Sequence, residues 1–240
     1  MGRRASPTKH SAMAHSKSFS RSSKGRLTDR DLGRFPGDTL FDRLARAVCH
    51  AGCLPRKELY EAWEVARRVR RIFRGGRVVD LGAGHGLLAH AMLLLDDSSP
   101  EALAVDTTRP VSSAALHESL VEEWPRLAGR VTAVTASLDE VDLQSTDVVV
   151  SSHACGALTD VVLARAVAAR ARVAVLPCCH DLQVSDAGAL TGWIDGPLAI
   201  DIRRAVCLEQ QRYRVWAQTI DSDITPKNRL LIGAPLGNLP

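Results

Sequence analysis

The segment V-V-D-L-G-A-G-H-G-L-L-A-H-A-M-L at residues 78–93 constrains the fold of this 240-residue chain more than any other stretch. It opens with residues typical of a buried strand and closes with a run of good helix formers. Between them stand Gly82, Gly84 and Gly86, which allow positive φ angles and leave no Cβ beside the backbone. A strand that turns this tightly into a helix is a place where a ligand can approach the backbone closely.

The rest of the chain repeats this alternation of short β-rich runs and helical patterns. Strands are predicted at 77–81, 102–106, 130–136, 147–152 and 172–177, and helices at 86–95, 112–127 and 156–170. Strand–helix–strand units of this length predict a parallel sheet with helices on both faces. Two later runs, at 213–220 and 228–234, leave little room for a helix between them. The sequence therefore predicts an α/β fold with a mostly parallel seven-stranded sheet that an antiparallel C-terminal pair closes.

Two helical patterns precede the sheet, and we expect residues 37–75 to form a helical cap on an α/β domain at 76–240. Apolar residues share one face of each pattern, and Pro55 suits the start of the second helix. The opposite face of that helix carries Arg67, Arg68, Arg70, Arg71 and Arg74. A solvated face is the simpler interpretation, and contact with phosphates is the alternative.

The N-terminal region is basic and rich in serine. Residues 1–28 contain seven Lys or Arg and no Asp or Glu. Such a segment buries too little apolar surface to offset the entropy of ordering, so we predict a disordered tail over residues 1–36. Beside a plain flexible tail, three functions remain open: a nucleic-acid-binding arm, an organelle transit peptide, and a myristoylation signal in the opening M-G-x-x-x-S.

The cysteines indicate a reducing compartment. Cys49, Cys53, Cys155, Cys178, Cys179 and Cys207 follow no disulfide framework, and no signal-peptide core or long apolar run is present. We therefore predict a cytoplasmic protein without a membrane span, with organelle import through the tail as the alternative, and a monomer by default.

Two details of the glycine segment distinguish between cofactors. The dinucleotide fingerprint G-x-G-x-x-G needs its third glycine where this chain has Leu87, which disfavours a hydride-transferring dehydrogenase. Asp106 ends the second predicted strand, where a carboxylate can accept hydrogen bonds from both hydroxyls of a ribose. Together with Asp80 two residues before the first glycine, this pattern resembles the class I S-adenosylmethionine-dependent methyltransferases.

The resemblance covers roughly residues 38–240 and implies a Rossmann-like class I methyltransferase fold with strand order 3-2-1-4-5-7-6. It implies S-adenosyl-L-methionine as the cofactor, with the first acid at the methionine end, the glycine turn under the ribose and carboxypropyl group, and the second acid on the ribose. The residues after the third strand would lie near adenine, although Asp139 could equally be a solvent-facing loop acid. The predicted cofactor-binding residues are Asp80, Gly82, Ala83, Gly84, His85, Gly86, Asp106, Leu138, Asp139 and His153.

The acceptor region follows the fourth and fifth strands. It reads S-S-H-A-C-G-A-L-T-D at 151–160 and L-P-C-C-H-D-L at 176–182, in place of the Asn/Asp-Pro-Pro-aromatic motif of adenine-N6 and glutamine methyltransferases. With I-T-P-K-N-R-L-L-I-G at 224–233, these motifs resemble a subgroup that includes eukaryotic tRNA acceptor-stem 2′-O-methyltransferases, glutathione-S-transferase-C-terminal-domain proteins and other methyltransferase-like proteins. The chain lacks the additional Cys/His zinc modules of those tRNA enzymes.

The candidate catalytic residues are His153, His180, Cys178 and Cys179, which with Cys155 would gather at the carboxyl ends of two adjacent strands. Four roles remain open: a general base from either histidine, a thiolate nucleophile at Cys178 after Pro177, a structural zinc site, or simple packing. Consecutive residues on a strand point to opposite faces, so Cys178 and Cys179 would not converge and no metal site is predicted.

Methyl transfer from a sulfonium needs little beyond in-line placement of the acceptor, so few catalytic residues are expected. The favoured acceptor is RNA, with a ribose 2′-hydroxyl as the candidate atom, bound through the basic tail and the arginine-rich helix. The alternatives are methylation of a small molecule or a protein, and a non-catalytic module of the same fold that binds cofactor or RNA.

Overall fold

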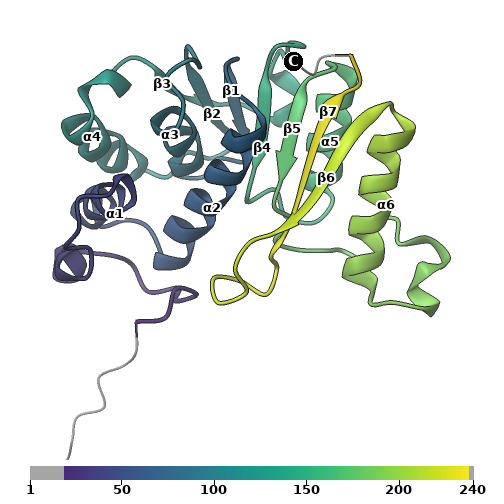
Figure 1. Ribbon diagram of the computed structural model, residues 1–240, viewed down its shortest axis with the longest axis horizontal. Coiled ribbons are helices and arrows are strands. Elements are labelled where there is room, and N and C mark those ends of the chain that lie inside the picture. Colours follow the sequence, from purple (N-terminus) through teal and green to yellow (C-terminus); the bar gives the residue numbers. More distant parts are fainter. Residues whose placement is uncertain (1–18, 238–240) are drawn as a thin grey trace, which may run out of the picture.

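The computed structural model describes residues 19–237 (Figure 1). Within them, seven strands form one sheet in the order β3-β2-β1-β4-β5-β7-β6. The strands are β1 (Val78–Leu81), β2 (Ala102–Asp106), β3 (Val131–Thr135), β4 (Val148–Ser151), β5 (Arg172–Val175), β6 (Tyr213–Thr219) and β7 (Arg229–Pro235). Strands β1 to β5 pair in parallel, whereas β7 pairs antiparallel with both β5 and β6. The predicted fold class and strand order are confirmed.

The central strands are buried on both sides, which explains their nearly continuous apolar sequences. Val78 and Val148 belong to a core with one set of helices, while their neighbours Val79 and Val149 belong to a second core behind the sheet. Successive side chains on a strand point to opposite faces, so both faces need apolar residues. The runs V-V-D-L and V-V-V-S follow from this requirement. Asp80 is the exception, because it is a charged residue buried in an otherwise apolar strand.

Six α-helices surround the sheet within the described part of the chain. They are α1 (Leu40–Ala51), α2 (Arg56–Ile72), α3 (Leu87–Leu94), α4 (Ser113–Glu123), α5 (Leu158–Ala168) and α6 (Gly196–Gln210). Apolar residues of α1 to α4 share the first core, and those of α5 and α6 share the second (Figure 1). The helix predicted at 112–127 ends early because Pro125 disfavours helical geometry in the residue before it. No helix within residues 19–237 has the length and apolarity that crossing a membrane requires.

Helix α6 was not predicted. Its buried face runs through Ala199, Ile200, Arg204 and Leu208, so a charged residue interrupts the apolar spacing. Arg204 is buried because its guanidinium bonds to Asp160 of α5, at 2.7 and 2.9 Å. The start of the helix did carry a usable signal: Asp195 caps it by accepting a hydrogen bond from the backbone of Leu198, and a proline lies in its first turn.

The predicted disordered tail does not extend to residue 36. Residues 1–18 lie outside the described residues, but 19–36 form defined contacts with the start of α2. Leu27 is fully buried, and its backbone N–H donates to the carbonyl oxygen of Leu54. Phe35 is also buried and contacts Phe41 of α1 edge to face, with ring centroids 6.1 Å apart. A few large apolar residues are thus enough to hold this segment on the helical cap.

The arginines of α2 do not form a free cationic face. Arg70 is 2% exposed, and its Nη1 lies 3.0 Å from the Asp96 carboxylate. Arg67 and Arg68 pair with Glu64 of the same helix at 2.7 and 3.1 Å. Arg74, just beyond the helix, is exposed but donates to the carbonyl oxygen of Leu95. Most of these charges therefore have structural partners, and phosphate contact through this helix stays a prediction.

Candidate active site

The glycine turn connects β1 to α3 at the carboxyl edge of the sheet. Gly82, Gly84 and Gly86 have φ angles of 74°, 52° and 81°, a region that L side chains rarely adopt. A Cβ on Gly86 would lie 3.1 Å from the Cβ of Ala104, so only glycine lets the helix start this close to the sheet. At Gly84, in contrast, a Cβ would meet no atom within 4 Å. The turn therefore exposes bare backbone to open space at its centre.

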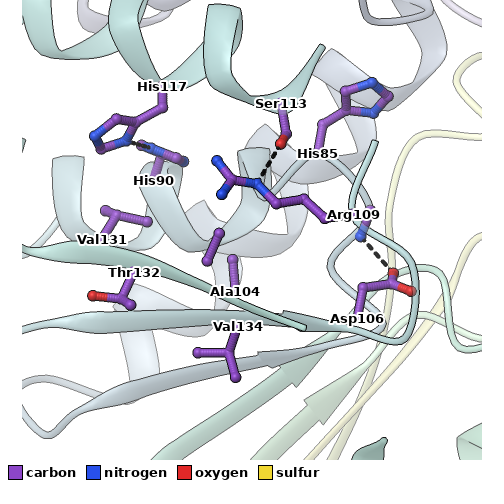
Figure 2. Close-up of a pocket in the computed structure, with 12 residues that line it drawn as sticks. His85, His90, Ala104, Asp106, Arg109, Ser113, His117, Val131, Thr132 and Val134 are labelled. Atoms are coloured by element: carbon purple, nitrogen blue, oxygen red, sulfur yellow. Dashed lines mark hydrogen bonds between the residues drawn. The ribbon is translucent and has the colours of Figure 1, made fainter. Parts of the chain in front are cut away.

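Asp106 faces this turn from the end of β2. One carboxylate oxygen accepts the backbone N–H of Gly84 at 2.8 Å, and the other accepts the N–H of Thr108 at 3.3 Å. The half-buried side chain borders a cavity of about 270 Å³ between the turn, α3, α4 and strands β2 and β3 (Figure 2). A carboxylate held in this way keeps lone pairs available for the hydroxyls of a ligand.

Asp80, at the end of β1, is a buried acid with an unsatisfied oxygen. The side chain is almost fully buried, and its Oδ2 atom finds no hydrogen-bond partner within residues 19–237. Burial, together with the negative charge of Asp106, raises the pKa of Asp80 to about 7. Burying such a group without a partner costs free energy, and a cationic ligand group beside it would offset that cost.

Several residues that line the cavity were missed by the sequence analysis: His90, Arg109, Ser113 and His117. Burial lowers the pKa of His90 to about 4, so its imidazole is neutral at neutral pH. Its Nδ1 lies 2.7 Å from the carbonyl oxygen of Gly86 and must donate there, which leaves Nε2 to accept from His117 Nδ1 at 3.0 Å (Figure 2). The helix pattern of α3 carries no sign of this role, because His90 occupies an ordinary position on a fully buried helix.

The loop after β4 packs directly on the glycine turn. The backbone N of Ala154 would be 3.6 Å from a Cβ on Gly82, and Ser151 donates from its hydroxyl to the carbonyl oxygen of Leu81 at 2.6 Å. The backbone carbonyl carbon of His153 would lie 3.8 Å from the same Cβ, so the loop places His153 next to the turn. Burial lowers the pKa of His153. The charges of Lys57 and His85 lower this pKa further, whereas the negative charge of Asp106 raises it. The imidazole is therefore neutral at pH 7 and able to accept a proton.

His180 contacts helix α6. Its Nε2 is 2.8 Å from Asp201 of α6, and its side chain is 1% exposed. Asp201 also accepts from Arg229 of β7 at 2.6 Å, so His180 belongs to a buried network that joins α6 to the sheet. This surrounding favours a structural role for His180.

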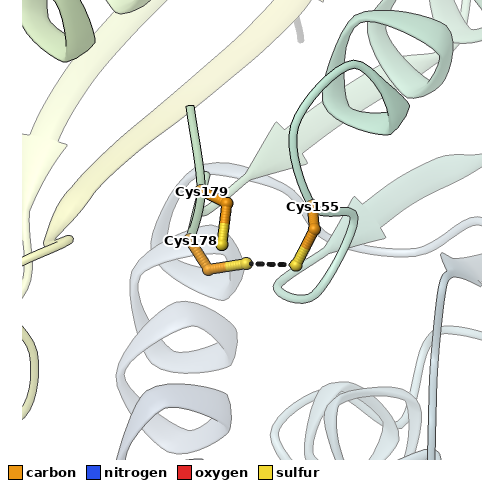
Figure 3. A group of neighbouring side chains, drawn as sticks. All are labelled: Cys155, Cys178 and Cys179. Carbon is orange, nitrogen blue, oxygen red and sulfur yellow. Dashed lines mark hydrogen bonds between the residues drawn. The ribbon is translucent and has the colours of Figure 1, made fainter. Parts of the chain in front are cut away.

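The cysteines converge in a way that the sequence analysis did not anticipate. The Sγ atoms of Cys155, Cys178 and Cys179 all lie within 4.8 Å of one another (Figure 3). The prediction that Cys178 and Cys179 point to opposite faces is wrong, because β5 already ends at Val175 and strict alternation ends with it. Burial raises the pKa of Cys178 and of Cys155, so both are thiols at neutral pH, which disfavours a free thiolate nucleophile.

Leu138 and Asp139, the two residues predicted near adenine, both belong to a short turn that contacts α5. Leu138 is buried in the core on the α5 side of the sheet, with its carbonyl oxygen accepting from Arg165. Asp139 is exposed, and its carboxylate lies 3.5 Å from the same arginine. These contacts hold the short 3₁₀ turn Leu138–Glu140 against α5.

The fold and the glycine turn define a class I methyltransferase, and comparison with known proteins gives the family. A family described as "Methyltransferase domain" matches residues 57–185, and the chain belongs to this family. S-adenosyl-L-methionine is the cofactor that this fold implies, as the sequence predicted. No curated protein sequence matches the chain.

Solved structures of similar fold share little sequence with the chain. An O-methyltransferase family protein from Burkholderia thailandensis is 18% identical, with a TM-score of 0.52, and the match covers 90% of this chain and 66% of that one. A Pyrococcus horikoshii protein described as a "putative RNA methyltransferase" is 18% identical, with a TM-score of 0.44, and the match covers 75% of this chain and 84% of that one. An O-methyltransferase from neocarzinostatin biosynthesis, solved with S-adenosylmethionine, is 23% identical (TM-score 0.44, coverage 67% and 49%). Similarity at this level establishes the fold and leaves the acceptor undetermined.

Proposed function

We propose that this protein transfers the methyl group of S-adenosyl-L-methionine to RNA, at a ribose 2′-hydroxyl. The observation that carries the proposal is the bare backbone at Gly84 beside the Asp106 carboxylate, with a neutral His153 whose pKa responds to the charge of Asp106. Asp106 would accept hydrogen bonds from the cofactor ribose. Asp80 would neutralise the ammonium of the methionine end, which gives its unpaired oxygen a partner. When bound, the cofactor supplies an already activated methyl group.

An RNA acceptor is supported by the basic N-terminal segment beside the crevice. The carbonyl oxygens of Ser23 and Gly25 accept the backbone N–H groups of Lys57 and Arg56, each at 3.0 Å, so the segment is fixed on the first turn of α2. Burial is the main cause of the lowered pKa of His85 and of His153, and the charges of Arg26 and Lys57 lower these pKa values further, respectively. Lys57 is paired with Glu61 at 3.0 Å, which leaves Arg26 as the cation near the turn that would attract phosphates.

His153 would act as the general base. Asp106 and the glycine turn would hold the cofactor, whose sulfonium would supply the methyl group that the ribose oxygen accepts. The hydroxyl proton passes to the imidazole and then to solvent. In-line placement of the two reacting atoms supplies most of the rate in this reaction, so one base and a shaped pocket are sufficient.

The acceptor is tested by incubating the protein with methyl-tritiated cofactor and either total RNA or total protein from cells. We expect label in the RNA fraction that ribonuclease releases, and a labelled nucleotide whose 3′ bond resists alkali because its 2′-oxygen is methylated. Label confined to protein would contradict the RNA proposal and leave the family assignment intact. Heat-inactivated protein is the control.

Replacing Asp106 by alanine should weaken binding of S-adenosylhomocysteine by about 1–3 kcal/mol, or roughly 5- to 150-fold, because charge-assisted hydrogen bonds to the ribose are lost. Isothermal titration calorimetry measures this change. Asp106→Asn keeps an oxygen for the N–H of Gly84 and so separates loss of charge from loosening of the turn. Asp38→Ala, at an exposed carboxylate that is not among the predicted site residues, is the matched control. Equal affinities of all four proteins would place the ribose elsewhere.

Cofactor affinity should also depend on pH through Asp80. Its pKa of about 7 in the free protein means that a proton must leave before the carboxylate can pair with an ammonium. The pKa falls on binding, so affinity increases as the pH rises toward 7 and levels off above it. For one such group the dissociation constant should fall by up to about eightfold between about pH 6.0 and 7.5. Asp80→Asn should remove this dependence, and a wild-type affinity that is flat over this range would show that Asp80 does not face the ammonium.

A further inference from the structure

We propose that Cys155, Cys178 and Cys179 form a binding site for a thiophilic divalent metal ion of the Zn²⁺ type, with three thiolate ligands and a fourth position open to solvent. The site stands on its own geometry and does not depend on RNA being the acceptor. Its three ligands come from the two loops that follow the parallel neighbours β4 and β5 (Figure 3).

The sulfur positions match the size of such a site. All three Sγ atoms lie within 4.8 Å of one another, and those of Cys155 and Cys178 are 3.0 Å apart. Tetrahedral zinc with Zn–S bonds of about 2.3 Å separates its sulfurs by about 3.8 Å. This value lies between the two observed limits, so small side-chain rotations would complete the triangle.

The backbone around the cluster is fixed before any metal binds. Leu176 donates its N–H to the carbonyl oxygen of Ser151 at 2.9 Å, which ties the start of one loop to the end of β4. The hydroxyl of Thr159 donates to the carbonyl oxygen of Ala154 at 2.6 Å, and Arg204 donates to that of Gly156 at 3.2 Å. Ligands that are already positioned lose little entropy when an ion binds.

The composition and exposure of the cluster favour a soft cation with one open position. Three sulfurs select zinc-like or softer ions over Mg²⁺ and Ca²⁺, which prefer oxygen. Cys155 and Cys179 are exposed and Cys178 is half-buried, so an ion can reach all three from solvent. Three protein ligands plus one water is the pattern of zinc sites that keep a position for a further ligand.

The test uses the full chain, stripped of metal and kept reduced with a phosphine, and titrated with Co²⁺ as a spectroscopic probe. We expect one equivalent to produce a thiolate-to-cobalt charge-transfer band and the visible bands of tetrahedral cobalt, and Zn²⁺ to abolish both. Mg²⁺ should produce no competition. Cys155→Ser, Cys178→Ser and Cys179→Ser should each remove or strongly weaken the bands, whereas Cys207→Ser, an exposed cysteine on α6, should leave them unchanged.

Circular dichroism melting of each variant distinguishes loss of a ligand from loss of the fold. The proposal is overturned if the reduced wild-type protein gives no charge-transfer band at saturating Co²⁺. It is equally overturned if the bands survive in a folded Cys178→Ser variant. A Cys155–Cys178 disulfide in the isolated protein, together with no cobalt band after reduction, would identify the cluster as a redox-active thiol pair. A negative metal titration would not contradict the proposed methyltransferase activity, so the two proposals are tested separately.

Discussion

The His153→Ala variant is expected to lose about 10²- to 10⁴-fold in kcat, while its affinity for S-adenosylhomocysteine stays close to that of the wild type. The loss corresponds to about 3–5 kcal/mol of transition-state stabilisation. It follows from the proposal that His153, which stands next to the glycine turn and is neutral at pH 7, takes the proton that a hydroxyl acceptor must give up. Single-turnover methylation with saturating cofactor and RNA measures the chemical step directly.

A His153→Gln variant keeps a hydrogen-bonding side chain but cannot take the proton, so it should be nearly as slow as the alanine variant. Burial holds the pKa of His153 below its usual range, so the wild-type rate should stay constant above about pH 6.5 and fall only at lower pH. His50→Ala, at an exposed histidine on α1, is the matched control. If His153→Ala raises the cofactor dissociation constant and leaves kcat unchanged, the residue shapes the cofactor pocket and is not the base.

The Arg70→Ala variant is expected to destabilise the protein by about 3–5 kcal/mol, because it takes from the buried Asp96 carboxylate its nearest and only buried cationic partner among the described residues. The Arg70 guanidinium pairs with Asp96 and also donates to the carbonyl oxygen of Met92 and the hydroxyl of Ser99, at 3.0 and 2.8 Å. These contacts join α2 to the end of α3, the helix that follows the glycine turn. Urea unfolding followed by circular dichroism measures the change in the free energy of unfolding.

Arg71 offers the matched control, since it is the neighbouring arginine and is exposed. Arg71→Ala should change the free energy of unfolding by no more than about 0.5 kcal/mol. If both variants were equally stable, the ion pair with Asp96 would contribute nothing and Arg70 would again be available to a ligand. Arg70→Met keeps most of the side-chain volume, so any difference from Arg70→Ala reports packing and not charge.

Much of the fold could be predicted because it follows from local sequence. The runs V-V-D-L and V-V-V-S are apolar on both faces of the strands, and the break in pattern at Gly82 marks the end of β1. Asp80, the glycines and Asp106 could be singled out because a turn of this kind requires particular residue types at fixed positions.

The remaining features depend on tertiary contacts that no local pattern records. Arg70 was expected on a solvated helix face and Arg204 lies on a helix that was not predicted, yet each is buried because an aspartate from another element pairs with it. Cys178 and Cys179 were expected to keep the alternating geometry of a strand, because the sequence does not show at which residue β5 ends. His90 and His117 meet only when α3 and α4 pack side by side, at 27 residues' separation.

The central claim is that a nucleoside lies with its sugar on Asp106 and its amino-acid portion along residues 82–86. A crystal structure of the protein with S-adenosylhomocysteine tests it most directly. The account predicts both ribose hydroxyls within hydrogen-bond distance of the Asp106 carboxylate, and the ligand ammonium on the Asp80 side of the turn. Density for the ligand at another edge of the sheet, with Asp106 still bonded only to the N–H groups of Gly84 and Thr108, would contradict it.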